Sequence, residues 1–361
     1  MNPAEWLVRT ACLSPTAPAL LKGEKIEADY ATFASRVAAI AGALCAKHRI
    51  CKGSRVAIFM NNRTEYLEAM YGIWFAGAVV VPINAKLHAK EAAWIIENAE
   101  AEIAFVSSDG GKALQAFAPK CLKELIYADL PEFSLLRQHV EMARPKVIHE
   151  DELMWLFYTS GTTGRPKGVM ISSGNISSMA MAYFSDVDEV HCNDAILYAA
   201  PMSHGAGIYN FMHVIRGARH VVPDSHGFDA DEILELAPKI DNISMFAAPT
   251  MVKRLVERAR AVGSNANGIK TITYAGGPMY VADIITAVAV LGNKFVQVYG
   301  QGECPMGITS LRRHFVSDRK HPNWRVRLGS VGVAQSPVLV RISDETGTTL
   351  TRGEIGEILV S

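Results

Sequence analysis

The sequence has no excess of charge of either sign. Its 361 residues include 36 Lys and Arg and 36 Asp and Glu, so the formal net charge at pH 7 is zero. Proteins that bind nucleic acid or an anionic membrane over a wide surface depend on an excess of positive charge. The balance therefore argues against nucleic acid as a partner, and any anionic ligand must be held by cations placed locally.

Cysteine is scarce and scattered. No two of the six cysteines form a Cys-x-x-Cys pair; they are Cys12, Cys45, Cys51, Cys121, Cys192 and Cys304. This spacing excludes the common zinc-binding motifs and gives no sign of a disulfide framework. We expect reduced thiols and a cytoplasmic location, because disulfides persist mainly in oxidising compartments.

Long hydrophobic runs are also missing. The longest apolar stretch, residues 71–83, contains Gly72, Gly77 and Pro82. It is shorter than the roughly 20 residues that a helix needs to cross a bilayer. The first residues carry Glu5 and have no basic start before an apolar core, so they do not match a signal peptide. We therefore predict no membrane-spanning segment.

Helical and strand patterns alternate along most of the chain. Apolar spacing predicts helices at 32–44, 64–75 and 90–100, and short apolar runs predict strands at 55–60, 79–83 and 103–106. Thr32 is the expected N-cap of the first of these helices. A second such series runs from 195 to 298, and this alternation is typical of parallel, doubly wound sheets. After about residue 324, short alternating strands and turns such as 344–347 predict a small antiparallel barrel.

Residues 158–169 contain the most informative segment, Tyr-Thr-Ser-Gly-Thr-Thr-Gly-Arg-Pro-Lys-Gly-Val. Such a loop offers free backbone N–H groups, hydroxyls and two cations, Arg165 and Lys167, which suit a triphosphate. The apolar run at 153–157 predicts a buried strand that holds the loop. The P-loop of nucleoside triphosphatases is excluded, because Gly168 follows Lys167 where that motif has Ser or Thr. A flexible surface linker is the remaining alternative.

Six further segments accompany this loop in a fixed order. They are 74–84 (Trp-Phe-Ala-Gly-Ala-Val-Val-Val-Pro-Ile-Asn), 201–205 (Pro-Met-Ser-His-Gly), 275–279 (Ala-Gly-Gly-Pro-Met), 298–303 (Val-Tyr-Gly-Gln-Gly-Glu), and the late pair 329–332 and 353–358. In sequence and order they resemble the motifs of the adenylate-forming, or AMP-binding, superfamily. The chain is most similar to its acyl-CoA synthetase branch, and the resemblance spans nearly the whole sequence.

The resemblance implies a fold and a domain organisation. The expected fold is α/β, with two doubly wound, flavodoxin-like α/β subdomains and a small distorted antiparallel β-barrel. Residues 1–361 would form the AMP-binding N-terminal domain, with subdomains at about 1–190, 191–318 and 319–361. In the family, a hinge and a C-terminal lid domain with a catalytic lysine come next. We therefore expect an isolated N-terminal domain without its lid.

The resemblance also implies nucleotide-binding residues. The phosphates would contact Thr159, Ser160, Gly161, Thr162, Thr163, Gly164 and Lys167. The adenosine side would contact Gly276, Gly277, Pro278, Val298, Tyr299, Gly300, Gln301 and Gly302, with Tyr299 stacked on adenine. Gly302 departs from the family, which usually has Thr at this position, so the phosphate contact there is in question.

Three residues are the implied catalytic set: Lys167, His204 and Glu303. Glu303 resembles the family's Mg²⁺ ligand, and one carboxylate with phosphates and water suits that ion. For His204 we favour an orienting role over that of a general base, because a carboxylic acid is already ionised at neutral pH. A helix-start glutamate and a structural histidine are the alternatives. His213, His220 and His226 are predicted to be surface or loop residues.

The acid would lie among mainly apolar residues. The expected pocket lining is Met202, Ala206, Ile208, Tyr209, Met245, Phe246, Ala275, Gly276 and Met306, and the expected substrate contacts are His204, Ala206, Tyr209, Ala275 and Met306. Ala206 is small and leaves space. No Asp occurs in 201–210 to hold an amino group, which argues against amino acids. Ordinary core packing is the alternative for each of these apolar positions.

The predicted function is that of an ATP-dependent carboxylic acid–CoA ligase. It would form an acyl-adenylate from an apolar fatty, carbocyclic or aromatic acid. ATP and Mg²⁺ would be its cofactors, and CoA would be a co-substrate. Two alternatives stay open: an adenylation domain that loads a carrier protein, and a non-catalytic nucleotide-binding fragment, since the chain alone is expected to turn over poorly. The sequence does not decide the oligomeric state, and a homodimer is one option.

Overall fold

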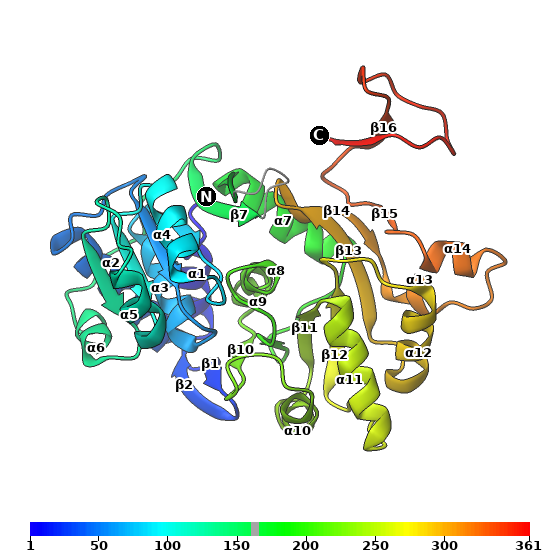
Figure 1. Cartoon of the computed structure of the whole chain (residues 1–361). Helices are drawn as coiled ribbons and strands as arrows, with labels where there is room; N and C mark the ends of the chain where they lie inside the picture. The colour runs from blue at the N-terminus through cyan, green and yellow to red at the C-terminus, as the bar shows by residue number, and fades with distance from the viewer. Residues whose placement is uncertain (160–165) are drawn as a thin grey trace.

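Two mainly parallel β-sheets organise the chain (Figure 1). The computed structural model describes residues 1–159 and 166–361. The first sheet has the order β6-β5-β3-β4-β7-β8, with β3 (Arg55–Phe59), β4 (Val79–Pro82), β5 (Ile103–Val106), β6 (Glu124–Tyr127), β7 (Leu153–Thr159) and β8 (Lys167–Ser172). Only β8 runs antiparallel to its neighbour in this sheet. Its helices are α1 (Ala4–Leu13), α2 (Tyr30–Ala46), α3 (Thr64–Phe75), α4 (Ala89–Asn98), α5 (Ser108–Gln115) and α6 (Pro131–Leu136).

The second sheet has the order β15-β14-β13-β12-β11-β9-β10-β1-β2. Its strands are β1 (Pro18–Lys22), β2 (Lys25–Asp29), β9 (Ala195–Leu197), β10 (Arg219–Val222), β11 (Ile243–Ala247), β12 (Ile269–Tyr274), β13 (Phe295–Gln301), β14 (Cys304–Leu311) and β15 (Val333–Ala334). The helices of this half are α7 (Ser173–Asp186), α8 (Gly205–Ile208), α9 (Asn210–Arg216), α10 (Ala230–Ile240), α11 (Pro249–Ala261), α12 (Val281–Leu291), α13 (Arg313–Ser317) and α14 (Trp324–Leu328). The chain ends in a separate antiparallel pair, β16 (Val340–Ser343) and β17 (Glu357–Val360).

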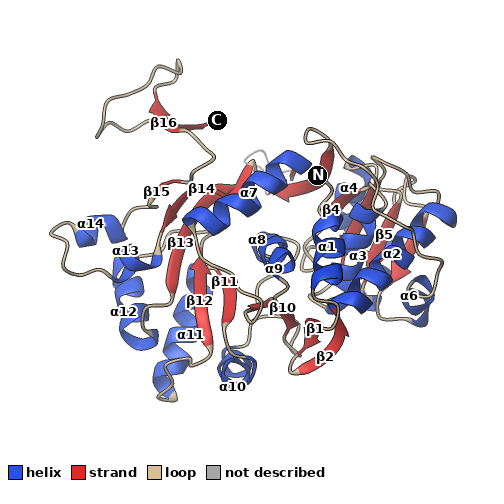
Figure 2. Cartoon of the chain, turned by 180° about the vertical axis from the view of Figure 1, so that it is seen from behind, coloured by secondary structure: helices blue, strands red, loops and turns tan. Residues whose placement is uncertain are grey.

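Three hydrophobic cores separate these layers. The largest lies between the sheets and combines inward-facing side chains of both, such as Trp155 and Val298, with helices that include α1, α3, α7 and α9. A second core packs α10, α11 and α12 on the outer face of the nine-stranded sheet. A third packs α4 on the outer face of the six-stranded sheet. Figures 1 and 2 show α8 and α9 between the two sheets, and the shared core fixes the sheets relative to each other.

The predicted α/β class and its main elements are confirmed. The helix expected at 64–75 is α3, and the strand expected at 103–106 is β5. The expected N-cap Thr32 is wrong: α2 begins at Tyr30, and Asp29 is the cap, because its carboxylate accepts a hydrogen bond from the Thr32 N–H at 2.8 Å. Aspartate is preferred to threonine at this position, because its carboxylate can accept a hydrogen bond from a free N–H of the first turn.

The sheets do not follow the expected subdomain limits throughout. Residues 18–29 lie in the first expected subdomain, yet β1 pairs in parallel with β10 and β2 pairs with β1, so both belong to the second sheet. The expected barrel region after residue 319 contributes the β16–β17 pair, whereas β15 extends the nine-stranded sheet next to β14. Strand pairing across 200 residues of sequence cannot be inferred from local patterns, so the structure was needed to show which strands share a sheet.

The prediction for two histidines is wrong. His213 and His220 are fully buried, and only His226 of the three is partly exposed. His220 Nδ1 lies 2.8 Å from the Tyr198 hydroxyl, and His213 Nδ1 donates to the Tyr209 carbonyl at 2.8 Å. Burial lowers the pKa of His213 from 6.5 to about 4, and it lowers the pKa of His220 well below its ordinary value. Both rings are therefore neutral parts of the shared core.

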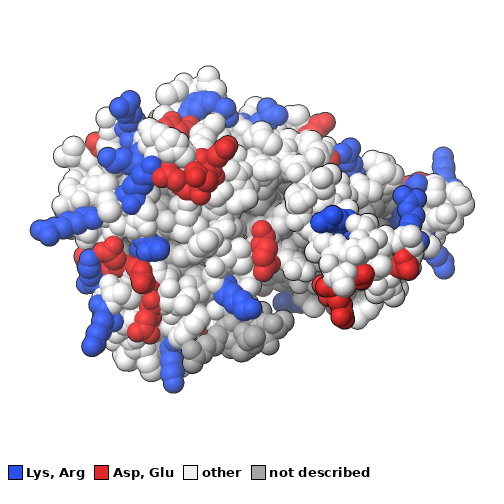
Figure 3. Space-filling model, turned by 90° about the horizontal axis from the view of Figure 1, so that it is seen from above, with Lys and Arg blue, Asp and Glu red and all other residues white. Residues whose placement is uncertain are grey.

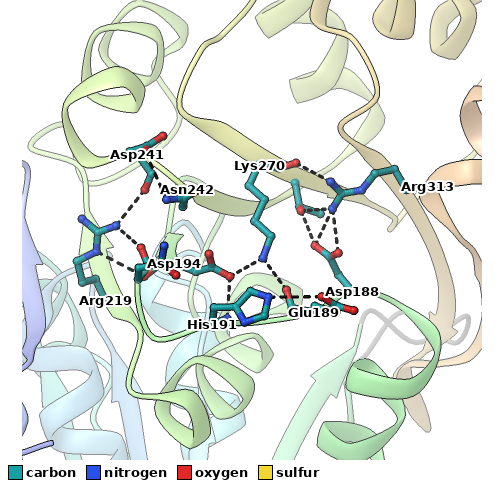
Figure 4. Close-up of polar contacts among 11 residues, drawn as sticks. Asp188, Glu189, His191, Asp194, Arg219, Asp241, Asn242, Lys270 and Arg313 are labelled. Carbon is teal, nitrogen blue, oxygen red and sulfur yellow. Dashed lines mark hydrogen bonds and ion pairs between the residues drawn. The ribbon is translucent and has the colours of Figure 1, made fainter.

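A polar network ties the amino-terminal ends of the central strands together (Figure 4). The Arg219 guanidinium donates to four backbone carbonyls, which belong to Asn193, Asp194, Ile240 and Asp241. Lys270 contacts the Asp194 carboxylate and the Glu189 carbonyl, while Arg313 contacts Asp188. Ligands of open parallel sheets bind at the opposite, carboxyl ends of the strands. We therefore assign this network to stabilising the fold.

The surface carries mixed charges. Figure 3 shows Lys and Arg interspersed with Asp and Glu on the face seen from above, in line with the zero net charge. Within the described part of the chain, every helix is too short or too polar to traverse a lipid bilayer.

Buried His213 should make stability depend on pH. The unfolded chain takes up a proton near pH 6.5, whereas the folded chain resists it until about pH 4. The stabilisation that comes from the low pKa of folded His213 is therefore complete above pH 6.5. It is lost as the pH falls toward 4, and the free energy of unfolding then decreases by up to about 1.4 kcal/mol per pH unit. His213→Gln should flatten the pH dependence of the free energy of unfolding, measured by chemical denaturation. The exposed His191→Gln serves as the control, and equal slopes in wild type and His213→Gln would contradict this assignment.

Candidate active site

The two sheets meet at a corner formed by their turns. Thr159, the last residue of β7, pairs with Lys167, the first residue of β8. Gly302, in the turn between β13 and β14, lies against this corner, because a Cβ there would overlap Cγ2 of Thr159 and come within 3.3 Å of Val169. The structure thus brings the edges of the expected phosphate loop beside the expected adenosine-side segment. Ser160, Gly161, Thr162, Thr163 and Gly164 lie outside the described residues.

Among the described residues of the corner, one cation and one carboxylate are exposed to solvent. Lys167 and Glu303 are both exposed. Glu303 lines a cavity of about 350 Å³ together with residues of α7 that include Asn175 and Met179. No group of three or more His, Cys, Asp or Glu side chains that could hold a metal ion occurs in residues 1–159 and 166–361. Glu303 therefore offers a single carboxylate, which suits an ion that takes its other ligands from phosphate and water.

His204 lies at the start of α8, facing the first sheet. Its Nδ1 is 3.1 Å from the Ser203 hydroxyl, and its ring packs edge-on against Phe157 of β7 with 5.8 Å between centroids. The side chain keeps solvent access, although the protein around the ring displaces enough water to lower the pKa of His204. Its imidazole is therefore neutral at pH 7 and can donate or accept one hydrogen bond.

The residues expected on the adenosine side follow β12 or lie at the end of β13. Gly276, Gly277 and Pro278 follow β12 and are exposed, and Gly276 has φ +79°, a conformation that favours glycine. Tyr299 is half-buried, and its hydroxyl accepts a hydrogen bond from Gln301 Nε2 at 3.0 Å. Val298 is buried in the shared core. Gly300 lies at a register shift between β13 and β14.

The expected acid-binding residues differ in how deeply they are buried. Phe246, Ala275 and Met306 are half-buried against the shared core, whereas Ala206 and Tyr209 are buried. Tyr209 packs on Phe246 with 5.8 Å between ring centroids. Met202 and Ile208 are buried in the same core, and Gly276 lies near Phe246. These positions therefore surround one region beside His204.

Met245 does not belong to this region. It is buried in the second core, on the outer face of β11, next to α10 and α11. Phe246 follows it and packs against the shared core on the inner face. Successive side chains of a strand point to opposite faces, so Met245 and Phe246 cannot both line one pocket. The prediction for Met245 is wrong.

Sequence reasoning missed Asn62, which positions the segment that carries His204. Asn62 Nδ2 donates to the Tyr198 and Ala200 carbonyls, each at 2.8 Å, and its Oδ1 accepts from the Met202 N–H at 2.9 Å. The Asn62 carbonyl also accepts a hydrogen bond from His226 Nδ1 at 2.7 Å. One side chain at the end of β3 thus connects the first sheet to the second. Its only sequence signal is its place in a pair of asparagines, Asn61 and Asn62, shortly after a buried strand.

Gln335 was also missed, and it supports Met306. Met306 has φ +49°, which is strained for a residue with a side chain. Gln335 Nε2 donates to the Met306 carbonyl at 2.6 Å, and Gln335 itself is buried. This contact fixes the strained turn that carries Glu303 and Met306, and nothing in the local sequence marks it.

Removal of the Asn62 side chain should loosen the site and the fold. Asn62→Ala leaves three buried backbone groups without their partner, so we expect the free energy of unfolding to fall by about 3 kcal/mol. Nucleotide affinity should fall with it. Asn61→Ala is the matched control, because Asn61 is exposed. Denaturation curves that coincide for the two variants would show that Asn62 does not connect the sheets.

The contact between Gly302 and Thr159 can be tested by a double-mutant cycle. Gly302→Ala adds a Cβ that overlaps Thr159 Cγ2, and overpacking of this kind costs about 1–3 kcal/mol. We expect AMP affinity, measured by calorimetry, to fall about fivefold to a hundredfold. Thr159→Ser removes Cγ2 and keeps the hydroxyl, so it should restore affinity in the double variant. Equal losses from Gly302→Ala in both backgrounds would rule out this contact.

Comparison with known proteins agrees with this arrangement. The family model of the AMP-binding enzymes matches residues 7–361. The chain is 28% identical to the feruloyl-CoA synthase of an Amycolatopsis species over 99% of this chain and 69% of that protein. It is 27% identical to the 2-succinylbenzoate–CoA ligase of Geobacillus kaustophilus, over 98% of this chain and 68% of that protein. Among solved structures, the inhibitor-bound N-terminal domain of FACL13 from Mycobacterium tuberculosis matches with a TM-score of 0.87 and 26% identity, over 99% of this chain and 88% of that one.

These relatives are CoA ligases, and the architecture is that of the N-terminal domain of acyl-CoA synthetases. The match covers nearly the whole chain and includes the segments that form the corner between the two sheets. The chain therefore belongs to the AMP-binding enzyme family.

Proposed function

We propose that the protein is an ATP-dependent carboxylic acid–CoA ligase that acts through an acyl-adenylate. The carboxylate oxygen attacks the α-phosphorus of ATP and pyrophosphate leaves; the thiolate of CoA then attacks the acyl carbon and AMP leaves. The contact of the Gly302 turn with Thr159 carries the proposal. It joins the edges of a hydroxyl-rich loop to a turn with a carboxylate, beside a region of apolar side chains.

The first step requires two anions to approach each other. A carboxylate and a triphosphate repel, so the site must neutralise the phosphates and aim the acid. We assign phosphate binding to Thr159 and Lys167 with the intervening loop. Lys167 is exposed at the start of β8, where its long side chain can reach a bound phosphate.

Glu303 is the proposed ligand for Mg²⁺. Its exposed carboxylate at the corner fits an ion that prefers oxygen ligands and keeps several waters. When bound, Mg²⁺ would supply positive charge at the phosphates. Tyr299 and Gly276 to Pro278 are assigned to the adenine side.

The acid is assigned to the region beside His204. Because the pKa of His204 is lowered, the ring is neutral and would orient the carboxylate by a hydrogen bond and not by charge. Ala206, Phe246, Ala275 and Met306 offer an apolar surface for the body of the acid. We favour a fatty, carbocyclic or aromatic acid, in keeping with the names of the relatives.

A second cavity supports CoA as the acceptor over a carrier protein. Its lining includes Ser203, next to His204, together with Asn84, Lys86, His226 and Arg254. Two cations at a cavity beside the reacting region fit the phosphates of CoA. The relatives, being CoA ligases, favour the same acceptor.

The test is ATP–pyrophosphate exchange with a panel of carboxylic acids, followed by thioester formation with CoA or with a phosphopantetheinylated carrier protein. We expect acid-dependent exchange and transfer to CoA. Transfer to the carrier alone would favour the carrier-loading alternative. Nucleotide binding without exchange for any acid would favour a non-catalytic protein.

Loss of the Glu303 charge should impair adenylation. Glu303→Gln keeps the shape but removes the charge, so exchange should fall at least tenfold and require more Mg²⁺. Because Glu303 is exposed, the free energy of unfolding should change little. Glu235→Gln, at an exposed position on α10, is the control. Normal exchange by Glu303→Gln at low Mg²⁺ would remove Glu303 from the metal site.

A further inference from the structure

Positive charge is concentrated in residues 312–328, which comprise α13, α14 and the turn between them. This segment has six Lys or Arg residues against one acidic residue, Asp318. The whole chain has equal numbers of both signs, so the excess is local. In Figure 1 these helices lie at the end of the molecule farthest from the six-stranded sheet, and Figure 3 shows several Lys and Arg side chains at the same, right-hand end.

The fold uses two of these six cations in ion pairs. Arg312 pairs with Asp186 at 2.8 Å, and Arg313 pairs with Asp188 at 2.9 Å. The other four cations are Arg319, Lys320, Arg325 and Arg327. No carboxylate within residues 1–159 and 166–361 forms an ion pair with any of these four. An anionic partner could therefore contact them without breaking an ion pair of the described fold.

Two aromatic rings hold three of the free cations in place. The guanidinium carbons of Arg319 and Arg325 lie 4.7 and 5.1 Å from the centroid of the Trp324 ring. The guanidinium carbon of Arg327 lies 5.4 Å from the centroid of Phe315. Both rings pack against the second core, so they form a fixed base. A guanidinium stacked on a ring keeps N–H donors at its edge for an anion.

Exposed apolar side chains lie beside these cations. Val326 of α14 is 75% exposed, and Tyr280, directly before α12, is 70% exposed. The two helices meet here, because a Cβ on Gly329 would lie 3.3 Å from Cγ2 of Val281. Val333, shortly after Gly329, is 62% exposed. Apolar side chains that gather on a surface with a charged rim mark a site of interaction with a partner.

We propose that residues 312–328, with the adjoining Tyr280, form a docking surface for a bilayer that contains anionic phospholipid. The four free cations contact the phosphates of the headgroups, and Val326 and Tyr280 enter the interfacial layer beneath them. Tryptophan and tyrosine are enriched at this depth of a bilayer, and clustered cations bind its anionic surface. A nucleic acid would satisfy the cations but would leave the exposed valine and tyrosine unexplained.

This docking surface is separate from the corner that carries Thr159 and Glu303. Binding to a bilayer in this way requires only a surface contact and no segment that crosses the bilayer. The inference therefore does not depend on the proposed ligase activity, and its test measures binding alone.

The first experiment measures co-sedimentation of the protein with vesicles. One set contains phosphatidylserine in phosphatidylcholine, and the other contains phosphatidylcholine alone. We expect the protein to prefer the anionic vesicles and to lose this preference at high salt, which screens exposed charges. Lys320→Gln combined with Arg325→Gln should lower the partition coefficient about twenty-five-fold, since each cation contributes about fivefold. Both residues are exposed, so the fold should be retained.

Lys112→Gln combined with Lys120→Gln is the matched control. It removes the same charge from two exposed positions in the other half of the molecule. Binding to anionic vesicles should change little in this variant. Equal losses in the two double variants would show that net charge alone drives binding, and would overturn the inference.

The apolar contact is tested by Val326→Ser. We expect binding to anionic vesicles to fall about fourfold, the contribution of roughly one buried CH₂ group. Val140→Ser is the control, because Val140 is 80% exposed but lies far from the segment in sequence. No preference for anionic vesicles, or binding of the polyanion heparin through Lys320 and Arg325 without binding of vesicles, would assign the surface to another anionic macromolecule and overturn the proposal.

Discussion

The hydrogen bonds of Asn62 are the constraint on which the site depends. A single buried side chain at the end of β3 satisfies two carbonyls and one N–H of the segment that leads to His204. This segment has left β9 and has not yet entered α8, so its backbone groups have no partners from regular structure. The amide of Asn62 supplies both donors and an acceptor, which no charged or apolar side chain could do. The position of His204 relative to the first sheet follows from this contact.

The shared core explains why the site lies between the sheets. Each sheet buries its inner face against the same helices, so the carboxyl ends of β7 and β13 are held at one corner. The turns at that corner contribute Thr159, Lys167, Gly302 and Glu303, which come from two separate sheets. A rigid core on one side and exposed turns on the other allow precise placement without burying the charged groups.

Local sequence patterns predicted what depends on local physics. Helix α3 and strand β5 have the expected limits because apolar spacing and turn residues act within a few residues. The segment expected to bind phosphate was singled out because its composition suits an anion, and its role stays a prediction. Patterns could not reveal that β1 and β2 join the distant sheet, that His213 and His220 are buried, or that Met245 faces the outer core. Each of these depends on pairing or packing between segments far apart in the chain. Asn62 and Gln335 were missed for the same reason, since their partners are backbone groups elsewhere.

The site departs from good packing in two places, and the departures are related. At the corner, Gly302 has no side chain, and the structure leaves no room for one while Thr159 keeps its methyl group. Glycine allows this close approach, because any side chain at position 302 would meet the Thr159 methyl group. Deeper in, the phenols of Tyr183 and Tyr209 retain unpaired hydroxyls where phenylalanine would pack without that penalty. Core residues that violate the rules of stability are most often found where function requires them. Gly302 lies at the corner where the two sheets meet, and Tyr183 and Tyr209 pack beside Phe246, so both departures fall in the region between the sheets.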